Sequence, residues 1–191
     1  MPLKSNAERW GGVTQWLHWL MAIGIIGSGA LGWYMEELPR GMAKINAYAL
    51  HKSIGMTVLA LLALRVAWRL YDRRPREEPM PRWQRRAAHA IHALMYLLML
   101  TIPLSGWLYN SARGYPLQWF KWFNLPALVE KNEALGDFAD QAHEVLAWIL
   151  AGVLIAHAGA SLVHHWFERD NTLLRMLPFA RLRPRPDGEK T

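Results

Sequence analysis

The chain has 191 residues, a length that suits a single domain. Its formal net charge is +7 and its mean hydropathy is −0.02. It contains no cysteine, which excludes disulfides, thiolate metal sites and covalent attachment of a c-type haem. A basic chain could bind nucleic acid, but Lys and Arg are concentrated in the connections between apolar blocks, and this distribution favours a membrane protein.

Three of the apolar blocks have 19 residues each and contain one histidine but no Lys, Arg, Asp or Glu; they span residues 16–34, 90–108 and 145–163. About 20 helical residues cross the hydrocarbon core of a bilayer, so each block predicts a transmembrane helix. The first block is longer than the apolar region of a usual signal peptide, and no clear cleavage site follows it. We therefore expect this helix to be retained.

A fourth block, residues 47–68, has His51 and Lys52 at one end and Arg65 at the other. We predict that it also spans the membrane, with the long basic side chains reaching the headgroups. Four spans leave too little polar sequence to cover a soluble core. The predicted fold is therefore an all-α membrane protein, a four-helix transmembrane bundle with helices at about 16–34, 47–68, 89–109 and 143–165.

The connection at residues 69–86 holds seven Arg, and the C-terminal segment is also basic, whereas residues 110–144 lean acidic. Since short cytoplasmic loops carry the excess of Lys and Arg, both the N- and the C-terminus are predicted to be cytoplasmic. The spans would form one domain, residues 9–178, followed by a solvated Arg- and Pro-rich tail, residues 179–191. The aromatic stretch 117–126 would lie at the outer membrane boundary or pack on the bundle.

Histidines inside a membrane are rare and usually functional. His143 and His157 are fourteen residues apart (157 − 143), which in a helix is roughly 21 Å along the axis and about 40° around it. The predicted topology puts His51 at the outer depth of His143, and His18 at the inner depth of His157. Two imidazole pairs at two depths predict a bundle enclosing two stacked haems, each with two histidine ligands, and such ligation favours electron transfer.

Zinc binding and proton transfer are alternative roles for these histidines. A zinc site would need three or four ligands in one place, and a proton relay gives no reason for pairing. Small residues could admit a porphyrin or let helices pack directly; they are Gly24, Gly27, Gly32, Ala156, Gly159 and Ala160. His89 and His92 could contact haem propionates, quinone or the membrane interface, and His164 and His165 end the fourth span on the same side. The secondary candidates for ligands are His89, His92, His164 and His165.

Several stretches resemble the bacterial four-helix cytochromes b561. They are TQWLHWL around His18, ALHKSIGM around His51, AAHAIHALMYLLMLTIPLSGWL in the third span, and AHEVLAWILAGVLIAHAGASLVHHWFERDNTLLRMLP through the fourth. The resemblance covers nearly the whole chain and implies an inner-membrane protein with two haem b groups. By position, the ligand pattern of that family and of the related hydrogenase and formate dehydrogenase cytochrome b subunits falls on His18, His51, His143 and His157.

The resemblance implies electron transfer between the quinone pool, near the inner haem, and a periplasmic redox partner at the outer haem. Some members of the family resemble superoxide oxidase, which takes electrons from superoxide and reduces ubiquinone. If this chain is of that kind, it is a superoxide:ubiquinone oxidoreductase. The acidic third connection opposes a positive outer face, although Lys52, Arg113 and Lys121 could make a local one. Alternatives are a cytochrome b anchor for a periplasmic dehydrogenase and a haem-free, His-based transporter. The expected partners are membrane lipid, a ubiquinone-like quinone and a periplasmic donor or acceptor, with no nucleic acid.

Overall fold

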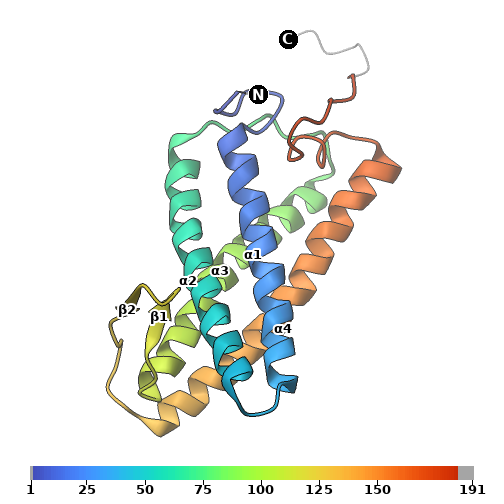
Figure 1. Cartoon of the computed structure of the whole chain (residues 1–191). Helices are drawn as coiled ribbons and strands as arrows, with labels where there is room; N and C mark the ends of the chain where they lie inside the picture. Colours follow the sequence, from blue (N-terminus) through green and yellow to red (C-terminus); the bar gives the residue numbers. More distant parts are fainter. Residues whose placement is uncertain (1, 185–191) are drawn as a thin grey trace.

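The structure is a computed structural model that describes residues 2–184 and consists mainly of four long helices (Figure 1). The helices are α1 (Gly12–Glu37), α2 (Met42–Tyr71), α3 (Arg82–Ala112) and α4 (Glu133–Val163), and α4 continues into a π-helical turn, η1 (His164–Glu168). Two short strands, β1 (Leu117–Trp119) and β2 (Phe123–Leu125), form an antiparallel hairpin between α3 and α4. All four long helices are apolar enough to cross a membrane, which confirms the predicted four-helix transmembrane bundle.

Helix α4 begins at Glu133, ten residues (143 − 133) before the start predicted from hydropathy. The side chain of Asn132 accepts a hydrogen bond from the Leu135 amide at 3.0 Å, and Glu133 places a negative charge in the first turn. Both features stabilise a helix N-terminus. The first turns of α4 are too polar to be recognised by hydropathy, which explains why the predicted start was late. Because the helix begins earlier, His143 lies well inside it rather than at its end.

The interior of the bundle holds two clusters of apolar side chains. Met21, Val58 and Leu62 form one between α1 and α2, and Met95, Leu98, Leu150 and Val153 form the other between α3 and α4. Ile25 and Met99 touch both clusters. Many other large apolar side chains point outward, as expected where lipid is the solvent. Helix α1 packs on α2, and α3 packs on α4, whereas α4 does not pack closely on α1 or α2 within residues 2–184.

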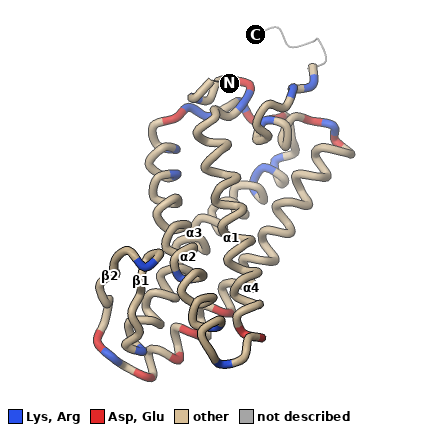
Figure 2. Tube along the Cα trace, in the orientation of Figure 1, with Lys and Arg blue, Asp and Glu red and all other residues tan. Residues whose placement is uncertain are grey.

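Charged residues gather at the two ends of the bundle and are sparse along its middle (Figure 2). Residues near both termini lie at one end, together with the Arg-rich connection between α2 and α3 (Figure 1). The hairpin and the connection between α1 and α2 lie at the opposite end. Following the excess of Lys and Arg, we call the end with the termini the inner end and the other the outer end.

The aromatic stretch 117–126 contains the hairpin, which packs on the outer part of α2. The Ser53 hydroxyl accepts a hydrogen bond from the Phe120 amide at 2.9 Å, and the Trp119 indole donates to the Thr57 hydroxyl at 3.1 Å. The hairpin was not predicted, because each of its strands has only three residues, and so short an alternation of apolar and polar residues does not indicate a strand. It covers the part of α2 that carries His51.

The N-terminal segment is fastened to the inner end of α2 by Asp72. The Asp72 carboxylate accepts hydrogen bonds from the Ser5 amide at 3.0 Å, the Ser5 hydroxyl at 2.6 Å and the Thr14 hydroxyl at 3.0 Å. The Ser5 hydroxyl in turn accepts from the Gly11 amide at 2.9 Å. Partial burial raises the pKa of Asp72, but these hydrogen bonds lower it by more, so the pKa lies below its ordinary value.

Replacing Asp72 with asparagine is expected to lower the free energy of unfolding at pH 7 by about 1 kcal/mol, because the amide turns a donor toward groups that themselves donate. The folded pKa lies below the ordinary value of 3.8, so the carboxylate contributes its full stability above that pH. This stability is lost as the pH falls through the folded pKa. Thermal unfolding in detergent should therefore separate wild type from D72N at pH 7 and progressively less below pH 4 (about the unfolded pKa).

The exposed Glu8 on the same segment supplies the matched control, and E8Q should unfold like wild type at both pH values. A D72N deficit that stayed the same in acid would show that the charge of Asp72 is not its cause.

The segment after η1 folds over the inner end of α1. The side-chain amide of Gln15 donates to the Arg175 carbonyl at 2.7 Å, and the Trp19 indole donates to the Met176 carbonyl at 2.8 Å. The Arg175 guanidinium forms an ion pair with the Glu78 carboxylate at 2.7 Å, and the two side chains are only 7% and 8% exposed. The segment after η1 therefore binds both α1 and the α2–α3 connection.

Residues in the described part of the predicted tail form hydrogen bonds with the rest of the chain. The Arg9 side chain donates to the Leu177 and Ala180 carbonyls at 3.2 and 3.3 Å. The side-chain amide of Asn171 donates to the Arg183 carbonyl at 3.2 Å, and the backbone amide of Arg183 donates back to Asn171 Oδ1 at 2.8 Å. Ala180 and Arg183 are therefore held against the chain by hydrogen bonds, whereas Phe179 is 78% exposed. The rest of the predicted solvated extension, residues 185–191, lies outside the described residues.

Candidate functional site

Four histidines face one another in two pairs inside the bundle. The rings of His18 in α1 and His157 in α4 have centroids 6.2 Å apart, and those of His51 in α2 and His143 in α4 have centroids 6.0 Å apart. We call His18/His157 the inner pair and His51/His143 the outer pair, after the ends of the bundle to which they are nearer. The structure thus brings together the partners that were expected from their depth along the predicted helices.

The spacing within each pair suits a metal held between the two rings. A metal–imidazole bond is about 2 Å long, so rings on opposite sides of one metal have centroids roughly 6 Å apart. Both pairs also reach from α4 to helices on which α4 does not pack closely in the described chain. Each pair therefore bridges the boundary between the α1/α2 half and the α3/α4 half, and these residues fit a haem with two axial imidazoles.

Oxygen acceptors on neighbouring helices orient the outer pair. His51 Nδ1 lies 3.0 Å from the Ser28 carbonyl oxygen and 3.2 Å from Ser28 Oγ. His143 Nδ1 lies 2.9 Å from the Ile102 carbonyl oxygen and 3.1 Å from Ser105 Oγ. A carbonyl only accepts, so Nδ1 donates in both rings and the neutral imidazole presents the lone pair of Nε2 to a metal. Sequence reasoning missed these acceptors, although serines inside apolar spans were an available signal.

Two glycines let the helices pass close to the rings of the outer pair. A Cβ added to Gly32 would lie 3.4 Å from His51 Cε1, and one added to Gly106 would lie 3.1 Å from His143 Cε1. Gly32 was among the predicted small residues, whereas Gly106 was missed. Its position directly after Ser105 in the third span was the signal that could have found it.

The remaining predicted small residues have different surroundings. A Cβ on Gly24 would lie 3.1 Å from a methyl group of Val58, so this glycine allows close packing of α1 on α2. A Cβ on Gly27 or Gly159 would meet no atom of the described chain within 4 Å other than the neighbouring residues and backbone of its own helix. Ala156 and Ala160 are exposed on the surface of the protein alone. The small residues therefore do not act as one set.

A cation approaches the inner pair. Arg65 Nη1 lies 3.3 Å from His18 Nδ1, and Arg65 Nε donates to the Tyr96 hydroxyl at 3.1 Å. Arg69 donates to the same hydroxyl at 3.5 Å. A guanidinium has no acceptor, so a hydrogen bond here would use the Nδ1 lone pair of His18. With Nε2 bound to a metal, Nδ1 would carry the ring proton, and Arg65 would act on the ring through its charge alone. The prediction that Arg65 extends to the headgroups is wrong, because partners on α1 and α3 hold its side chain inside the bundle.

His92 in α3 also reaches the inner pair. Its ring centroid lies 5.3 Å from that of His157, and its Nδ1 donates to the Ala88 carbonyl at 2.6 Å. His92 is therefore the one secondary candidate that the described structure places beside a primary candidate. The 6.2 Å spacing between His18 and His157 is closer to the roughly 6 Å expected for two rings on one metal.

Two further candidates contact groups away from the pairs. The exposed His89 has Nε2 3.2 Å from Glu77 Oε1, as an interface or surface residue would. The carbonyl of His165 accepts from the Arg183 side chain at 3.0 Å, which ties it to the C-terminal segment.

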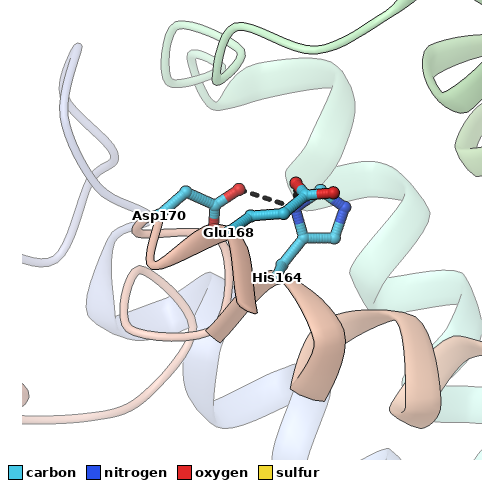
Figure 3. Close-up of side chains that lie close together, drawn as sticks. All are labelled: His164, Glu168 and Asp170. Carbon is cyan, nitrogen blue, oxygen red and sulfur yellow. Dashed lines mark hydrogen bonds and ion pairs between the residues drawn. The ribbon is translucent and has the colours of Figure 1, made fainter. Parts of the chain in front are cut away.

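His164 lies between two carboxylates at the inner end of α4 (Figure 3). Its Nδ1 is 2.6 Å from Asp170 Oδ2 and 2.8 Å from Glu168 Oε2. One imidazole and two carboxylates within 4.8 Å of one another form a donor set that could hold a divalent cation. The same residues also terminate the helix, because Asp170 accepts from the Thr172 amide at 2.8 Å and its own amide donates to the His164 carbonyl at 3.2 Å.

Comparison with known sequences assigns the family. The family model described as prokaryotic cytochrome b561 matches residues 9–179. The chain belongs to the prokaryotic cytochrome b561 family. Membership implies haem b binding and electron transfer in a membrane, and the four spanning helices make this cytochrome b561 a bacterial multi-pass membrane protein.

Individual relatives of this cytochrome b561 align over most of its length. Cytochrome b561 homolog 2 of Escherichia coli (strain K12) is 38% identical over 93% of this chain and 95% of its own length. Cytochrome b561 homolog 1 of the same strain is 32% identical over 85% of this chain and 93% of its own length. A protein of Yersinia pestis named probable superoxide oxidase CybB is also 32% identical, over 85% of this chain and 92% of its own length.

Proposed function

We propose that this cytochrome carries two haem b groups in the bacterial inner membrane and passes electrons between a periplasmic redox partner and the quinone pool. His18 and His157 would be the axial ligands of the inner haem, and His51 and His143 those of the outer haem. The observation that carries the proposal is the spacing of the two pairs, 6.2 and 6.0 Å, across the boundary between two helix pairs.

The chain's own residues hold the imidazoles and exclude water. Haem iron with two imidazole ligands exchanges single electrons and has no open position for oxygen chemistry. Hydrogen bonds to the Ser28 and Ile102 carbonyls fix the rings of the outer pair. The apolar clusters of the bundle occupy the interior and keep it dry. Electrons are thereby confined to a path that runs between the two ends of the bundle.

A finer form of the proposal makes superoxide the outer donor and a ubiquinone-like quinone the acceptor. The relative named probable superoxide oxidase supports it, and so does Lys52, which follows His51 in α2. Lys52 Nζ donates to Asn110 Oδ1 at 3.1 Å and to the Pro116 carbonyl at 3.3 Å. Both acceptors are neutral, so the charge of Lys52 remains to attract an anion.

The overall reaction of this finer form balances. Two superoxide anions each give up one electron and leave as dioxygen. One quinone takes up those two electrons and two protons and becomes quinol.

The first test is to purify the protein in detergent, record its reduced-minus-oxidised absorption spectrum and count the extracted haem. We expect about two b-type haems per chain, one for each pair of imidazoles. One haem would mean that one pair is wrongly assigned, and none would leave the histidines to protons or to another metal.

The role is tested on the same preparation with an enzymatic source of superoxide and a short-chain quinone. Quinone reduction that depends on superoxide supports the oxidase. Copurification with a large periplasmic dehydrogenase, together with inactivity toward superoxide, would support the anchor subunit instead.

A further inference from the structure

The two histidine pairs differ in the groups that face their imidazole nitrogens. In the outer pair, both Nδ1 atoms donate to carbonyl oxygens, that of Ser28 at 3.0 Å and that of Ile102 at 2.9 Å. In the inner pair, His18 Nδ1 faces the guanidinium of Arg65 at 3.3 Å. Both rings of the outer pair therefore donate to oxygen atoms, whereas one ring of the inner pair, that of His18, faces a cation.

Each of these surroundings acts on a bound iron in a definite direction. A hydrogen bond from Nδ1 to a carbonyl raises the basicity of the imidazole, and a more basic ligand stabilises the ferric state. A nearby positive charge stabilises the ferrous state, because that state carries one positive charge less. The interaction is stronger inside an apolar span than in water. Both effects therefore place the inner potential above the outer one.

The neighbouring charged side chains act in the same sense. Arg69 joins Arg65 at Tyr96, with their guanidinium groups 5.5 and 5.9 Å from the centre of that ring, so two positive charges lie on the side of the inner pair. Near the outer pair the charges oppose one another. Lys52 follows His51 in α2, but Asp140 precedes His143 by one turn of α4.

We propose that Arg65 raises the reduction potential of the inner haem above that of the outer haem, and so directs electrons from the outer face to the inner face. This inference rests on the proposed function, since it requires a haem at each pair. It adds a direction to that function: the periplasmic partner is the electron donor, and the quinone is reduced at the inner face. In each transfer, one electron would pass from a haem held by His51 and His143 to a haem held by His18 and His157.

The test is a redox titration followed by the absorption of the haems, in detergent. The His143→Ala variant, which should keep only the inner haem, and the His157→Ala variant, which should keep only the outer haem, assign the two potentials. We expect the inner haem to have the higher potential in the wild-type protein. R65Q should lower it by at least about 59 mV, a tenfold change in the equilibrium constant for one electron, with a much smaller shift of the outer haem.

R65K keeps the positive charge and should therefore keep most of the wild-type reduction potential of the inner haem. If the guanidinium acted only through its shape, R65K would lower this potential as R65Q does. The exposed Arg74 in the α2–α3 connection supplies a matched control, because R74Q removes the same charge at the same end of the bundle and should shift neither potential.

Equal potentials, or an inner potential below the outer one, would overturn the inference, as would equal shifts of both haems in R65Q. The order of the two potentials in the wild-type protein decides the question even if R65Q fails to fold. Two haems in the opposite order would contradict this inference and leave the proposed function intact. Fewer than two haems would contradict the proposed function itself.

Discussion

Replacing His157 with alanine should reduce the haem content from the proposed two to about one per chain, because the inner pair loses one of the two imidazoles proposed as axial ligands. The haem that remains should be the outer one, since the 6.0 Å spacing of His51 and His143 does not depend on His157. Replacing His143 should give the reciprocal result and leave the inner haem. Haem extraction and the reduced-minus-oxidised spectrum measure both changes.

Two neighbouring histidines serve as controls for this experiment. The exposed His89 should tolerate alanine with both haems retained. His92, whose ring is 5.3 Å from that of His157, tests the assignment of the inner pair. If H92A lost a haem and H18A did not, the inner ligands would be His92 and His157. Loss of both haems from H157A, with helical content preserved, would show that the two sites do not load independently.

Replacing Glu78 with glutamine should lower the free energy of unfolding by about 3–5 kcal/mol, because it leaves the Arg175 guanidinium buried without its carboxylate. The two side chains are 8% and 7% exposed, and their ion pair ties the α2–α3 connection to the C-terminal segment. The variant should unfold at lower temperature in detergent. Limited trypsin digestion should also cut it faster at the arginines that follow η1.

Glu77, the adjacent residue, is the matched control. Its carboxylate pairs with Arg85 at 3.1 Å on the surface, where its side chain is 52% exposed, so E77Q should cost about 1 kcal/mol or less. The double variant E78M/R175M, which removes both buried charges, should recover much of the stability lost in E78Q. Equal, small effects of E77Q and E78Q would contradict a structural role for the buried pair.

The four spans and the two histidine pairs were predictable because each rests on a regular property of the helix. Hydropathy summed over about 20 residues finds a span whatever its neighbours are. Fourteen residues of helix return His157 to nearly the face of His143, and an antiparallel topology then fixes the depths at which His18 and His51 lie. The structure places the rings of both pairs close together on this basis.

The features that were missed depend on contacts between segments that are distant in sequence. Arg65 could have extended to the headgroups, and only Tyr96 on α3 and His18 on α1 turn it inward. Gly106 matters because the ring of His143 lies against it. The early start of α4 was different, since Asn132 followed by Glu133 is a local capping signal that a hydropathy scan does not read.

Helix α4 supplies one histidine to each pair, and it is the last of the four long helices to be synthesised. A nascent chain that ends before residue 143 therefore holds His18 and His51 without either of their partners. The segment that closes over the inner end of α1, through Arg175 and Met176, emerges later still. Under the proposed ligation, therefore, neither haem could be held by two imidazoles until the part of α4 that carries its histidine had been synthesised.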